Sequence, residues 1–447
     1  MRGETYRPVA FLSVATRINL YFLKANTTTL SYMLKNYFKI AITVLKRRKF
    51  FTFISLFGIS FSLTILIVLT AFIDNSISAN YPDTKRDRSL YITNVGLRKQ
   101  LPDGSSNWGG SGSFYFLDHY TSMLRTPVKV AISSMSAATN TYVNNKKLVI
   151  AVKYTNDAYW DVLNYNFIEG KPYDKQQIKN GEHVTVISEQ LKNSYFGDVP
   201  SVVGKYIEAD NVQYRVAGVV KNVAIINMYA FADLYLPYTV SKANYKDEFF
   251  MGNYTAILLA NSKDDLPKIK AEFDQIVSRI PLGKDWDLLI AHADSYLETF
   301  TREAFGGGKK TNSGFAYFIL TVTAFALLFL LLPTLNLVNI NTSRILERSS
   351  EIGVRKAFGA SSATLVLQFI VENIILTLLG GIISIIFSFV ILKLINGGNL
   401  LQNTQLTINV RVVIYAFITC LVFGFISGVY PAWRMSRLQV VNALKQV

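Results

Sequence analysis

Long stretches without a charged residue constrain this chain more than any other feature. The first runs from Phe50 to Ile73 and reads FFTFISLFGISFSLTILIVLTAFI. A helix needs about 20 predominantly apolar residues to cross a bilayer, and this stretch is longer. Three more stretches are uncharged and mostly apolar: Phe315 to Val338, Ile374 to Leu392 and Val412 to Trp433. A buried core helix, the alternative for any one stretch, seldom runs so far without a charge. The sequence therefore predicts an α-helical membrane protein with four transmembrane helices.

The placement of charge predicts how these helices are oriented. The chain is 50% hydrophobic and carries a net charge of +16, which in a soluble protein would suggest a nucleic-acid partner. Here basic residues gather before the first stretch and after the second and fourth. Cytoplasmic segments of membrane proteins are enriched in lysine and arginine. We therefore expect a multi-pass protein of the inner (cytoplasmic) membrane, with both termini in the cytoplasm, contacting lipid and no nucleic acid. The basic residues are Lys35, Lys39, Lys46, Arg47, Arg48 and Lys49, then Arg344, Arg348, Arg355 and Lys356, then Arg434, Arg437 and Lys445.

These observations divide the chain into segments. A compact basic lead-in to the first stretch begins at Met33, which we expect to be the natural start; whether residues 1–32 are translated stays open. The predicted segments are a cytoplasmic N-terminal segment (1–49), transmembrane helix 1 (50–73), an extracytoplasmic domain (74–313), transmembrane helix 2 (314–340), a cytoplasmic coupling segment (341–368), transmembrane helix 3 (369–393), a short external loop (394–411), transmembrane helix 4 (412–433) and a cytoplasmic C-terminus (434–447).

The extracytoplasmic segment is predicted to be a large α+β domain inserted between helices 1 and 2. Short runs rich in β-branched residues predict strands, and interleaved helices favour one layer of helices on a sheet. The glycine- and serine-rich stretch from Leu101 to Phe114 predicts a mobile loop. The strand-like runs are KLVIAV (147–152), HVTVIS (183–188), YRVAGVV (214–220) and TAILLA (255–260).

One helix of this domain has a clear amphipathic pattern. Asp265 is expected to cap it, and Pro267 falls in its first turn. Its apolar residues repeat at helical spacing, and they are Ile269, Phe273, Ile276 and Ile280.

The sequence carries no recognisable catalytic or cofactor motif. The stretch FGGGKKTNSG superficially resembles a phosphate-binding loop. However, Glu303 stands where the first glycine of that motif belongs, and Lys310 follows Lys309 where serine or threonine is required. We therefore expect no catalytic residue, no metal and no bound cofactor in this chain. The lone cysteine, Cys420, lies in the fourth apolar stretch, so the extracytoplasmic domain has no disulfide. The histidines His119, His183 and His292 lack metal-ligand spacing and are expected to be surface or hydrogen-bonded residues.

A segment carrying both charge signs, ERSSEIGVRKAFGASSATL, separates the second and third apolar stretches. Glu351 and Arg355 stand four residues apart and would share a helix face, and Gly359 can end that helix in the left-handed conformation. Ser361 or Ser362 can cap the next helix. The pattern predicts a helix, turn, helix elbow at the cytoplasmic face, which could be a solvated connector or a docking surface for a partner.

The sequence around this elbow resembles the MacB/FtsX-type permeases of ABC transporters. The stretch from Leu335 to Glu372 contains their Arg-x-x-Glu-Ile-Gly-x-Arg-(Arg/Lys)-Ala-x-Gly-Ala core, and Gly428 to Lys445 is similar to their C-terminal motif, with departures at Met435 and Val440. The extracytoplasmic runs follow the order of a MacB-like periplasmic core domain. The residues that match the core are Arg348, Glu351, Ile352, Gly353, Arg355, Lys356, Ala357, Gly359 and Ala360.

The resemblance implies a permease subunit that does no chemistry itself. Two similar subunits, identical or different, would pair, and a separate cytoplasmic ATPase holding ATP and Mg would drive movements of the extracytoplasmic domain, a process called mechanotransmission. Export of an antimicrobial, a peptide or a lipoprotein is the expected result, with a periplasmic adaptor and an outer-membrane channel as further possible partners. The segment matching Glu351 to Gly359 would be the coupling helix seated on the ATPase.

A different class of protein stays open as the alternative. A membrane receptor or regulator with an extracytoplasmic sensory domain, for example one controlling cell-wall hydrolases in the manner of FtsX, would have the same topology across its first two helices. A membrane-bound enzyme is disfavoured by the missing motifs.

Overall fold

A computed structural model gives the fold of the chain. It describes residues 38–39, 42–43, 45–47, 49–102, 104–126, 128–143, 146–305, 313–347, 354, 362–398, 403–411, 413–415, 417–418, 421–422, 425 and 429. The chain divides into two units. We call them the helical unit, formed by residues up to 69, 324–390 and 408 onwards, and the sheet unit, formed by 70–323 and 391–407.

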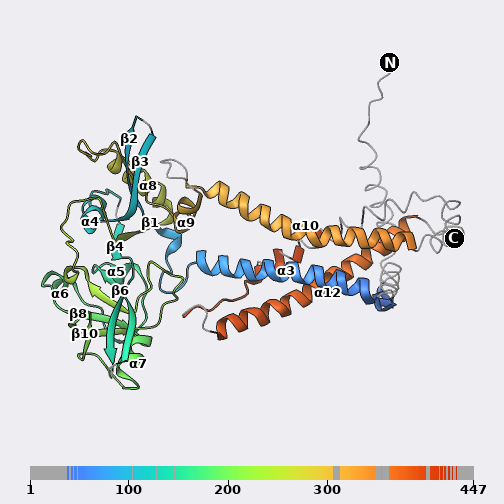
Figure 1. The fold of residues 1–447 in the computed structure, drawn as a ribbon, viewed down its shortest axis with the longest axis horizontal. Helices are drawn as coiled ribbons and strands as arrows, with labels where there is room; N and C mark the ends of the chain where they lie inside the picture. Colours follow the sequence, from blue (N-terminus) through green and yellow to red (C-terminus); the bar gives the residue numbers. More distant parts are fainter. Residues whose placement is uncertain are drawn as a thin grey trace, which may run out of the picture. The chain divides into compact units, whose positions relative to one another are not determined.

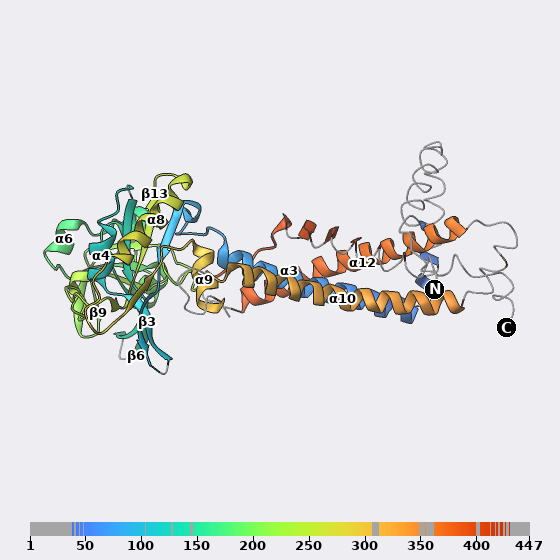
Figure 2. The same cartoon turned by 90° about the horizontal axis from the view of Figure 1, so that it is seen from above.

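The helical unit is built from three long helices that lie side by side (Figures 1 and 2). They are α3 (Lys49–Ile77), α10 (Phe315–Glu347) and α12 (Ser362–Gly397), and their outer parts continue into the sheet unit. Among the described residues, Lys49–Ile77 and Ile370–Gly397 are long and apolar enough to cross a membrane, and Phe315–Phe329 is a shorter apolar stretch. Only scattered residues of the predicted fourth helix are described, so four transmembrane helices stay a prediction.

Two glycines of α12 bring its neighbours into close contact. A Cβ added to Gly380 would lie 2.6 Å from Cγ2 of Ile59 on α3, and one added to Gly381 would lie 2.5 Å from a ring carbon of Phe417. Membrane helices associate through such small residues because lipid gives them no hydrophobic driving force. Gly380 therefore sets how closely α12 approaches α3.

The sheet unit contains one large mixed sheet. Its main path runs β14-β2-β3-β13-β4-β6-β11-β8-β10-β7, with β1, β12, β5 and β9 paired beside that path. The pairs β10 with β8 and β11 with β6 are parallel, and the others are antiparallel. The strands are β1 (Ser89–Ile92), β2 (Val95–Leu101), β3 (Gly104–Gly112), β4 (Val128–Ser134), β5 (Ala137–Val143), β6 (Lys146–Thr155), β7 (Phe167–Gly170), β8 (Val184–Ser188), β9 (Tyr206–Ala209), β10 (Val212–Val220), β11 (Leu234–Pro237), β12 (Met251–Gly252), β13 (Tyr254–Ala260) and β14 (Leu288–Ala291).

Short helices pack on this sheet, and several begin with a side-chain cap. Ser113 accepts a hydrogen bond from the backbone N–H of Phe116, and Ser188 accepts one from Leu191, so α4 and α7 each start at a serine. Figure 2 shows α4 and α8 beside β13. The helices are α4 (Phe114–Thr121), α5 (Tyr159–Val162), α6 (Lys175–Lys179), α7 (Glu189–Phe196), α8 (Leu266–Ser278) and α9 (Tyr296–Phe305), with 3-10 turns at Arg86–Arg88, Tyr238–Val240 and Lys263–Asp265.

Most of the elements predicted for this unit are confirmed. The four strand-like runs are β6, β8, β10 and β13, and the amphipathic helix is α8, which buries Ile269 and Phe273. Asp265 lies at the predicted cap position, but the predicted cap bond was wrong, because its side chain makes no capping hydrogen bond to α8. The carboxylate instead accepts from the N–H of Ser262 in the preceding turn and lies 4.0 Å from the ammonium of Lys268.

The predicted mobile loop from Leu101 to Phe114 was also wrong. It is strand β3, which pairs with β2 without a break from Leu101↔Gly104 to Val95↔Gly110, and α4 begins at Phe114. Its composition suggested a loop, but the ladder with β2 holds it extended. The two strands project from the sheet unit as a hairpin (Figure 1).

Lys153 on β6 is fully buried in the sheet unit. Its ammonium donates to the backbone oxygen of Ser134 at 2.7 Å and to that of Met228 at 3.5 Å. Burial lowers the pKa of Lys153 to about 7, because the low-polarity interior disfavours the charged form. The side chain joins β4 to the segment that carries Met228, and its charge opposes the folding of this unit.

We predict that Gly380→Ala destabilises the chain. The added Cβ meets Cγ2 and Cβ of Ile59 at 2.6 and 2.9 Å, so the helices must separate, at a cost of about 1–3 kcal/mol typical of overpacking. The midpoint of thermal unfolding in detergent should fall, and Ile59→Ala in the same chain should restore it. Gly397→Ala on the same helix is the control, because nothing lies within 4 Å of its added Cβ. Equal midpoints for the two alanine variants would contradict the close packing.

We also predict that the sheet unit becomes more stable as pH rises above 7. The pKa of Lys153 is about 7 in the folded chain and near its ordinary 10.5 in the unfolded chain. Between these values the unfolded state binds more protons, so the free energy of unfolding rises with pH and levels off near 10.5. Thermal unfolding of the full chain, followed by near-ultraviolet circular dichroism at pH 7 to 10, should show this slope, and Lys153→Met should reduce it. An unchanged slope in the variant would exclude Lys153 as its source.

Candidate functional site

The residues predicted to contact an ATPase lie outside the described part of the chain. They are Arg348, Glu351, Ile352, Gly353, Arg355, Lys356, Ala357 and Gly359. Between Glu347 and Ser362, the structure describes only Val354, which is helical and exposed. Helix α10 continues beyond the predicted transmembrane helix 2 as far as Glu347, and α12 begins at Ser362. The elbow is therefore flanked by two long helices, and the predicted contacts within it stay untested.

The described residues contain a buried polar cluster where α3 ends within the sheet unit. We call this cluster the joint, and it consists of Asp83, Arg86, Asn227, Tyr296 and the backbone of residues 76–78. The Nε of Arg86 donates to Oδ2 of Asp83 at 2.8 Å, and one terminal nitrogen donates to Oδ1 of Asn227 at 2.8 Å. Its other terminal nitrogen donates to the backbone oxygens of Ser76, Ile77 and Ser78 at 3.2, 3.2 and 2.6 Å.

This geometry suits the end of a helix. The last turn of α3 leaves carbonyl groups without intrahelical partners, and the helix dipole places partial negative charge there. A guanidinium offers five donors in a rigid fork, so Arg86 can bond these carbonyls, Asp83 and Asn227 together. The joint thereby holds the last turn of α3 against the body of the sheet unit.

Aromatic side chains enclose the joint. The guanidinium carbon of Arg86 lies 3.6 Å from the ring centre of Tyr296, which is the first residue of α9. Burial raises the pKa of Tyr296 to about 12, so the ring is neutral at physiological pH. The hydroxyl of Tyr91 donates to Oδ2 of Asp83 at 2.8 Å, and burial together with the Asp83 charge raises the pKa of Tyr91 far above its usual value. Both tyrosines stay protonated, and the Asp83–Arg86 pair is shielded from water.

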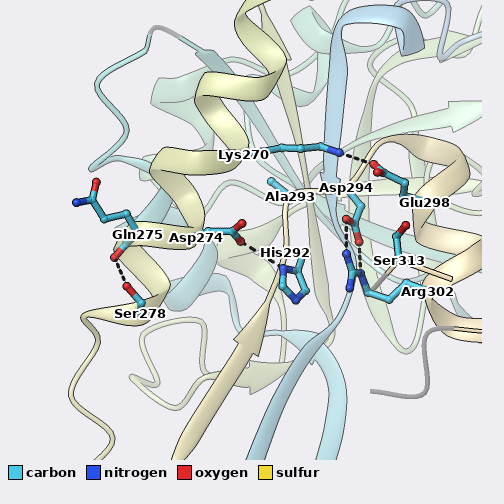
Figure 3. A pocket seen from close by; sticks show the side chains of 10 residues that line it. All are labelled: Lys270, Asp274, Gln275, Ser278, His292, Ala293, Asp294, Glu298, Arg302 and Ser313. Carbon is cyan, nitrogen blue, oxygen red and sulfur yellow. Dashed lines mark hydrogen bonds and ion pairs between the residues drawn. The ribbon is translucent and has the colours of Figure 1, made fainter. Parts of the chain in front are cut away.

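A charged cleft adjoins the joint along α9. The cleft has a volume of about 600 Å³ and lies between α8 and the segment that joins β14 to α9 (Figure 3). Lys270 of α8 pairs with Glu298, and two nitrogens of Arg302 contact the carboxylate of Asp294, one of them at 2.8 Å. These contacts fasten α9 to α8 and to the end of β14.

The third pair in the cleft involves a histidine. Nδ1 of His292 lies 3.3 Å from Oδ1 of Asp274 on α8, while its Nε2 is buried with no hydrogen-bond partner among the described residues. The prediction of a surface or hydrogen-bonded residue is thus met by the Asp274 contact. Lys270 faces Glu298 and Arg302 faces Asp294, while Asp274 contacts the imidazole of His292 (Figure 3). The arrangement can hold α9 and the end of the preceding segment against α8.

The outer end of α12 forms a third attachment within the sheet unit. The side chain of Asn396 accepts from the N–H of Leu406 at 3.0 Å and donates to its carbonyl oxygen at 2.9 Å. Two further hydrogen bonds hold the segment that follows α12. Asn403 donates to Oε1 of Gln190 on α7 at 3.0 Å, and Asn75 of α3 donates to the carbonyl of Gln405 at 3.2 Å. We call these bonds the tether.

Sequence reasoning missed the joint because its residues look like surface residues. Asp83 and Arg86 lie in the charged stretch YPDTKRDRSL, and Asn227 is far away in sequence. It also missed a carboxylate in the helical unit. Glu372 of α12 is 1% exposed and accepts a bond from Gln368 at 3.2 Å; it lies within the predicted helix 369–393 but before the uncharged stretch that begins at Ile374.

Comparison with known families accounts for both units. Residues 52–276 match the model of the MacB-like periplasmic core domain, and residues 323–440 match that of the FtsX-like permease C-terminal domain. Together these matches include α3, most of the sheet unit and the elbow.

Individual relatives share low sequence identity with this chain. The chain is 25% identical to the macrolide export ATP-binding/permease protein MacB of Acinetobacter baylyi over 72% of its own length and 46% of that protein. It is 24% identical to the uncharacterized ABC transporter permease YknZ of Bacillus subtilis over 71% of its length and 75% of that protein. The chain thus spans about half the length of the MacB relative.

Two matching solved structures are domains of a MacB and a YknZ protein. The periplasmic region of MacB from Actinobacillus actinomycetemcomitans is 14% identical, with a TM-score of 0.34, and the match covers 48% of this chain and 92% of that one. The extracellular domain of YknZ is 15% identical, with a TM-score of 0.31 and coverage of 41% and 91%. On the family models, which together match most of the chain, this protein belongs to the family of MacB/FtsX-type ABC transporter permeases.

Proposed function

We propose that this chain is the membrane-spanning subunit of an ABC transporter driven by a separate cytoplasmic ATPase. The chain would lie in the inner (cytoplasmic) membrane. Its transmembrane helices would be 50–73, 314–340, 369–393 and 412–433, and both termini would lie in the cytoplasm. The sheet unit would lie outside. The positive-inside distribution of lysine and arginine supports this topology. The subunit itself would be non-catalytic and bind no cofactor, and ATP and Mg would belong to the partner.

The mechanism we propose is mechanotransmission, and the joint is the observation that carries it. Arg86 bonds two backbone carbonyls of the last turn of α3 and that of Ser78 directly after it, and it bonds the body of the sheet unit through Asp83 and Asn227. A rigid helix end bonded in this way cannot shift without moving the domain to which it is bonded. A displacement of transmembrane helix 1 would therefore move the sheet unit directly.

The chain segment leading to transmembrane helix 2 has its own attachment. Helix α9 begins at Tyr296 in the joint and is fastened by Glu298 and Arg302 in the cleft. These ion pairs are partly exposed, and exposed pairs contribute less than buried ones and weaken with salt. We infer that α9 can move relative to α8 more easily than α3 can leave the joint.

The elbow would receive the force from the ATPase. The elbow joins the end of α10 to the start of α12 and contains the eight predicted contact residues, from Arg348 to Gly359. Its basic side chains would meet an acidic surface of the ATPase. Relatives are named for the export of macrolides and of pyoverdine, which supports an export function for this chain, with an antimicrobial, a peptide or a lipoprotein as the proposed cargo. Two subunits would pair, with a periplasmic adaptor and an outer-membrane channel as further candidate partners.

The coupling assignment predicts that charge reversal in the elbow separates the chain from its ATPase. In the variant carrying Arg355→Glu and Lys356→Glu, the ATPase that co-purifies with the natural chain should be lost, because like charges would then face each other at the contact. The amount of co-purified ATPase and its hydrolysis rate are the measurements. Reversal of Arg411, the last residue of the predicted external loop, is the matched control and should leave both unchanged. A stable, active complex with the double variant would refute the assignment.

The joint predicts that Arg86→Lys uncouples the sheet unit from ATP hydrolysis. A lysine can keep the ion pair with Asp83, but it lacks the fork that bonds residues 76–78. ATP hydrolysis by the complex should continue, while the ATP-dependent change in hydrogen exchange of the sheet unit should disappear. Lys129→Met, which breaks an exposed ion pair with Asp161, is the control and should preserve that change.

A second substitution at this position tests the stability of the joint. Arg86→Met leaves the carboxylate of Asp83 buried without a cation, which should cost about 3–5 kcal/mol of folding free energy. Normal coupling in Arg86→Lys would show that the motion does not depend on the joint. Normal stability in Arg86→Met would show that folding does not depend on it.

A further inference from the structure

Asn227, one of the residues of the joint, begins a tight turn. Its backbone oxygen accepts from the N–H groups of Ala230 and Phe231 at 2.8 and 2.7 Å. Its side chain belongs to the joint, where Oδ1 accepts from Arg86 and Nδ2 donates to the backbone oxygen of Tyr81, both at 2.8 Å. We call the turn from Asn227 to Phe231 the clamp. The clamp cannot rotate away from the joint without breaking these bonds, and buried polar groups left without partners are costly.

Tyrosine hydroxyls hold the other side of the clamp. The backbone oxygen of Ala230 accepts from the hydroxyl of Tyr165 at 2.7 Å and from that of Tyr235 at 2.9 Å. The oxygen of Tyr235 in turn accepts from the N–H of Ala232 at 3.1 Å. The hydroxyl of Tyr159 lies 2.7 Å from that of Tyr165 and 3.3 Å from the carbonyl of the clamp. A hydroxyl donates one proton and a carbonyl oxygen has two lone pairs, so the shorter bonds can all form together.

These tyrosines stay protonated and connect the clamp to the middle of the sheet. Burial raises the pKa of Tyr159, Tyr165 and Tyr235 well above the ordinary value, because the interior disfavours a charged phenolate. Each hydroxyl is therefore a donor at physiological pH. Tyr235 lies on β11, which pairs with β6 on one side and with β8 on the other, and Tyr159 is the first residue of α5.

The clamp is separated from β11 by Ala232 and Asp233. The backbone of Asp233 is bonded to the sheet on both sides, through the carbonyl of Ala151 on β6 and the N–H of Ser188 after β8 begins, each at 2.8 Å. Ala232 is therefore the point at which the clamp could bend away from β11. The hydroxyl of Tyr235 spans this point, since it bonds both the N–H of Ala232 and the carbonyl of the clamp.

Lys153 and Ser136 also bond the clamp, but more weakly. Lys153 donates to the backbone oxygen of Met228 at 3.5 Å, which is long for a hydrogen bond. Ser136 donates to the backbone oxygen of Phe231, but its side chain is exposed, so water competes for this bond. In contrast, Ala230 and Tyr235 are 2% and 0% exposed, and water competes little for the bond between them.

We propose that the clamp is the part of the sheet unit that receives a displacement of α3, and that Tyr165 and Tyr235 are the positioning residues that pass it to β11. The proposal rests on the proposed function and deepens it, because it names the residues that connect the joint to the sheet. Arg86 holds the side chain of Asn227, and the tyrosines hold a carbonyl three residues further along the same turn. A displacement of Arg86 would therefore reach β11 through hydrogen bonds at both ends of the clamp.

Distance measurements between spin labels test the proposal in the full chain bound to its ATPase, with Cys420→Ser as the background. Ile225→Cys, 42% exposed, places one label beside the clamp, and Val149→Cys, 60% exposed, places the other on β6. Dilution of labelled chains with unlabelled ones restricts the signal to pairs within one chain. With all tyrosines present, ATP should leave the distance between the labels unchanged, because the clamp and the sheet move together.

Removal of the hydroxyls should free the clamp from the sheet. In the variant carrying Tyr165→Phe and Tyr235→Phe, which keeps both rings, ATP should shift the distance by about 2 Å, the size of helix shifts in switching proteins. Tyr173→Phe is the matched control and should show no shift, because the hydroxyl of this buried tyrosine bonds Thr155 instead of the clamp. If the double variant does not fold, Tyr165→Phe alone decides, since it keeps the bond of Tyr235 to the backbone.

The possible results separate this inference from the proposed function. A distance that ATP does not change in the variant, or that it changes with all tyrosines present, would overturn the role of the clamp. A purely structural role of the hydroxyls would lower the midpoint of thermal unfolding without making the distance depend on ATP. If ATP still alters hydrogen exchange of the sheet unit in the natural chain, and Arg86→Lys abolishes that effect, the proposed function stands without the clamp. If ATP alters neither the exchange nor the distance, both fail.

Discussion

The bonds of Arg86 are the interaction on which the rest of the sheet unit depends. Removing a guanidinium from water costs several kcal/mol unless its donors and its charge are both matched. Here Asp83 supplies the charge, Asn227 and the carbonyls of residues 76–78 accept the N–H groups, and the ring of Tyr296 covers one face. These partners come from the end of α3, from the segment between α3 and β1, from the loop that carries Asn227 and from the start of α9. Loss of Asp83 would leave the buried guanidinium without a counter-charge, and loss of Asn227 or of the carbonyls would leave buried N–H groups of Arg86 without acceptors.

The three attachments in the sheet unit differ in strength for physical reasons. In the joint, the side chains of Arg86 and Asp83 are 5% and 6% exposed, so water and salt screen their attraction little. In the cleft, Lys270 and Glu298 are 33% and 26% exposed, and their attraction is correspondingly weaker. The tether relies on neutral amides such as Asn403, which carry no net charge and compete with water. Displacement would therefore be absorbed first at the tether, then in the cleft and last at the joint.

Sequence patterns predicted the parts of this fold that local forces decide. The β-branched runs of β6, β8, β10 and β13 and the apolar repeat of α8 each carry their own signal, and all were placed correctly. Strand β3 was missed because glycine and serine disfavour strands and only its ladder with β2 holds it extended. The cap of α8 was misassigned because Asp265 has two possible partners, and the nearer turn at Ser262 takes its carboxylate.

The joint could not have been predicted, since its bonds join residues far apart in the chain. Asn227 follows Arg86 by 141 positions, and no local pattern marks either as buried. The motif of the elbow shows the reverse case. It is specific enough to indicate the family, and the family models agree, yet its residues lie outside the described structure. The motif thus identifies the family of this chain, whereas the contact of the elbow with an ATPase stays a prediction.

Close packing in the helical unit matters to the proposal as much as the joint does. A push on the elbow can reach the sheet unit only if the helices between them do not slip. Gly380 lets α12 approach α3 until side chains touch, and Ile59, Leu63 and Leu66 of α3 pack with α10. Packed interiors resist compression and pass displacement on. The joint makes the outer end of α3 rigid, and these contacts make its membrane-embedded part follow its neighbours. Under the proposed function, loss of either would leave ATP hydrolysis intact and the sheet unit unmoved, so the proposal requires both.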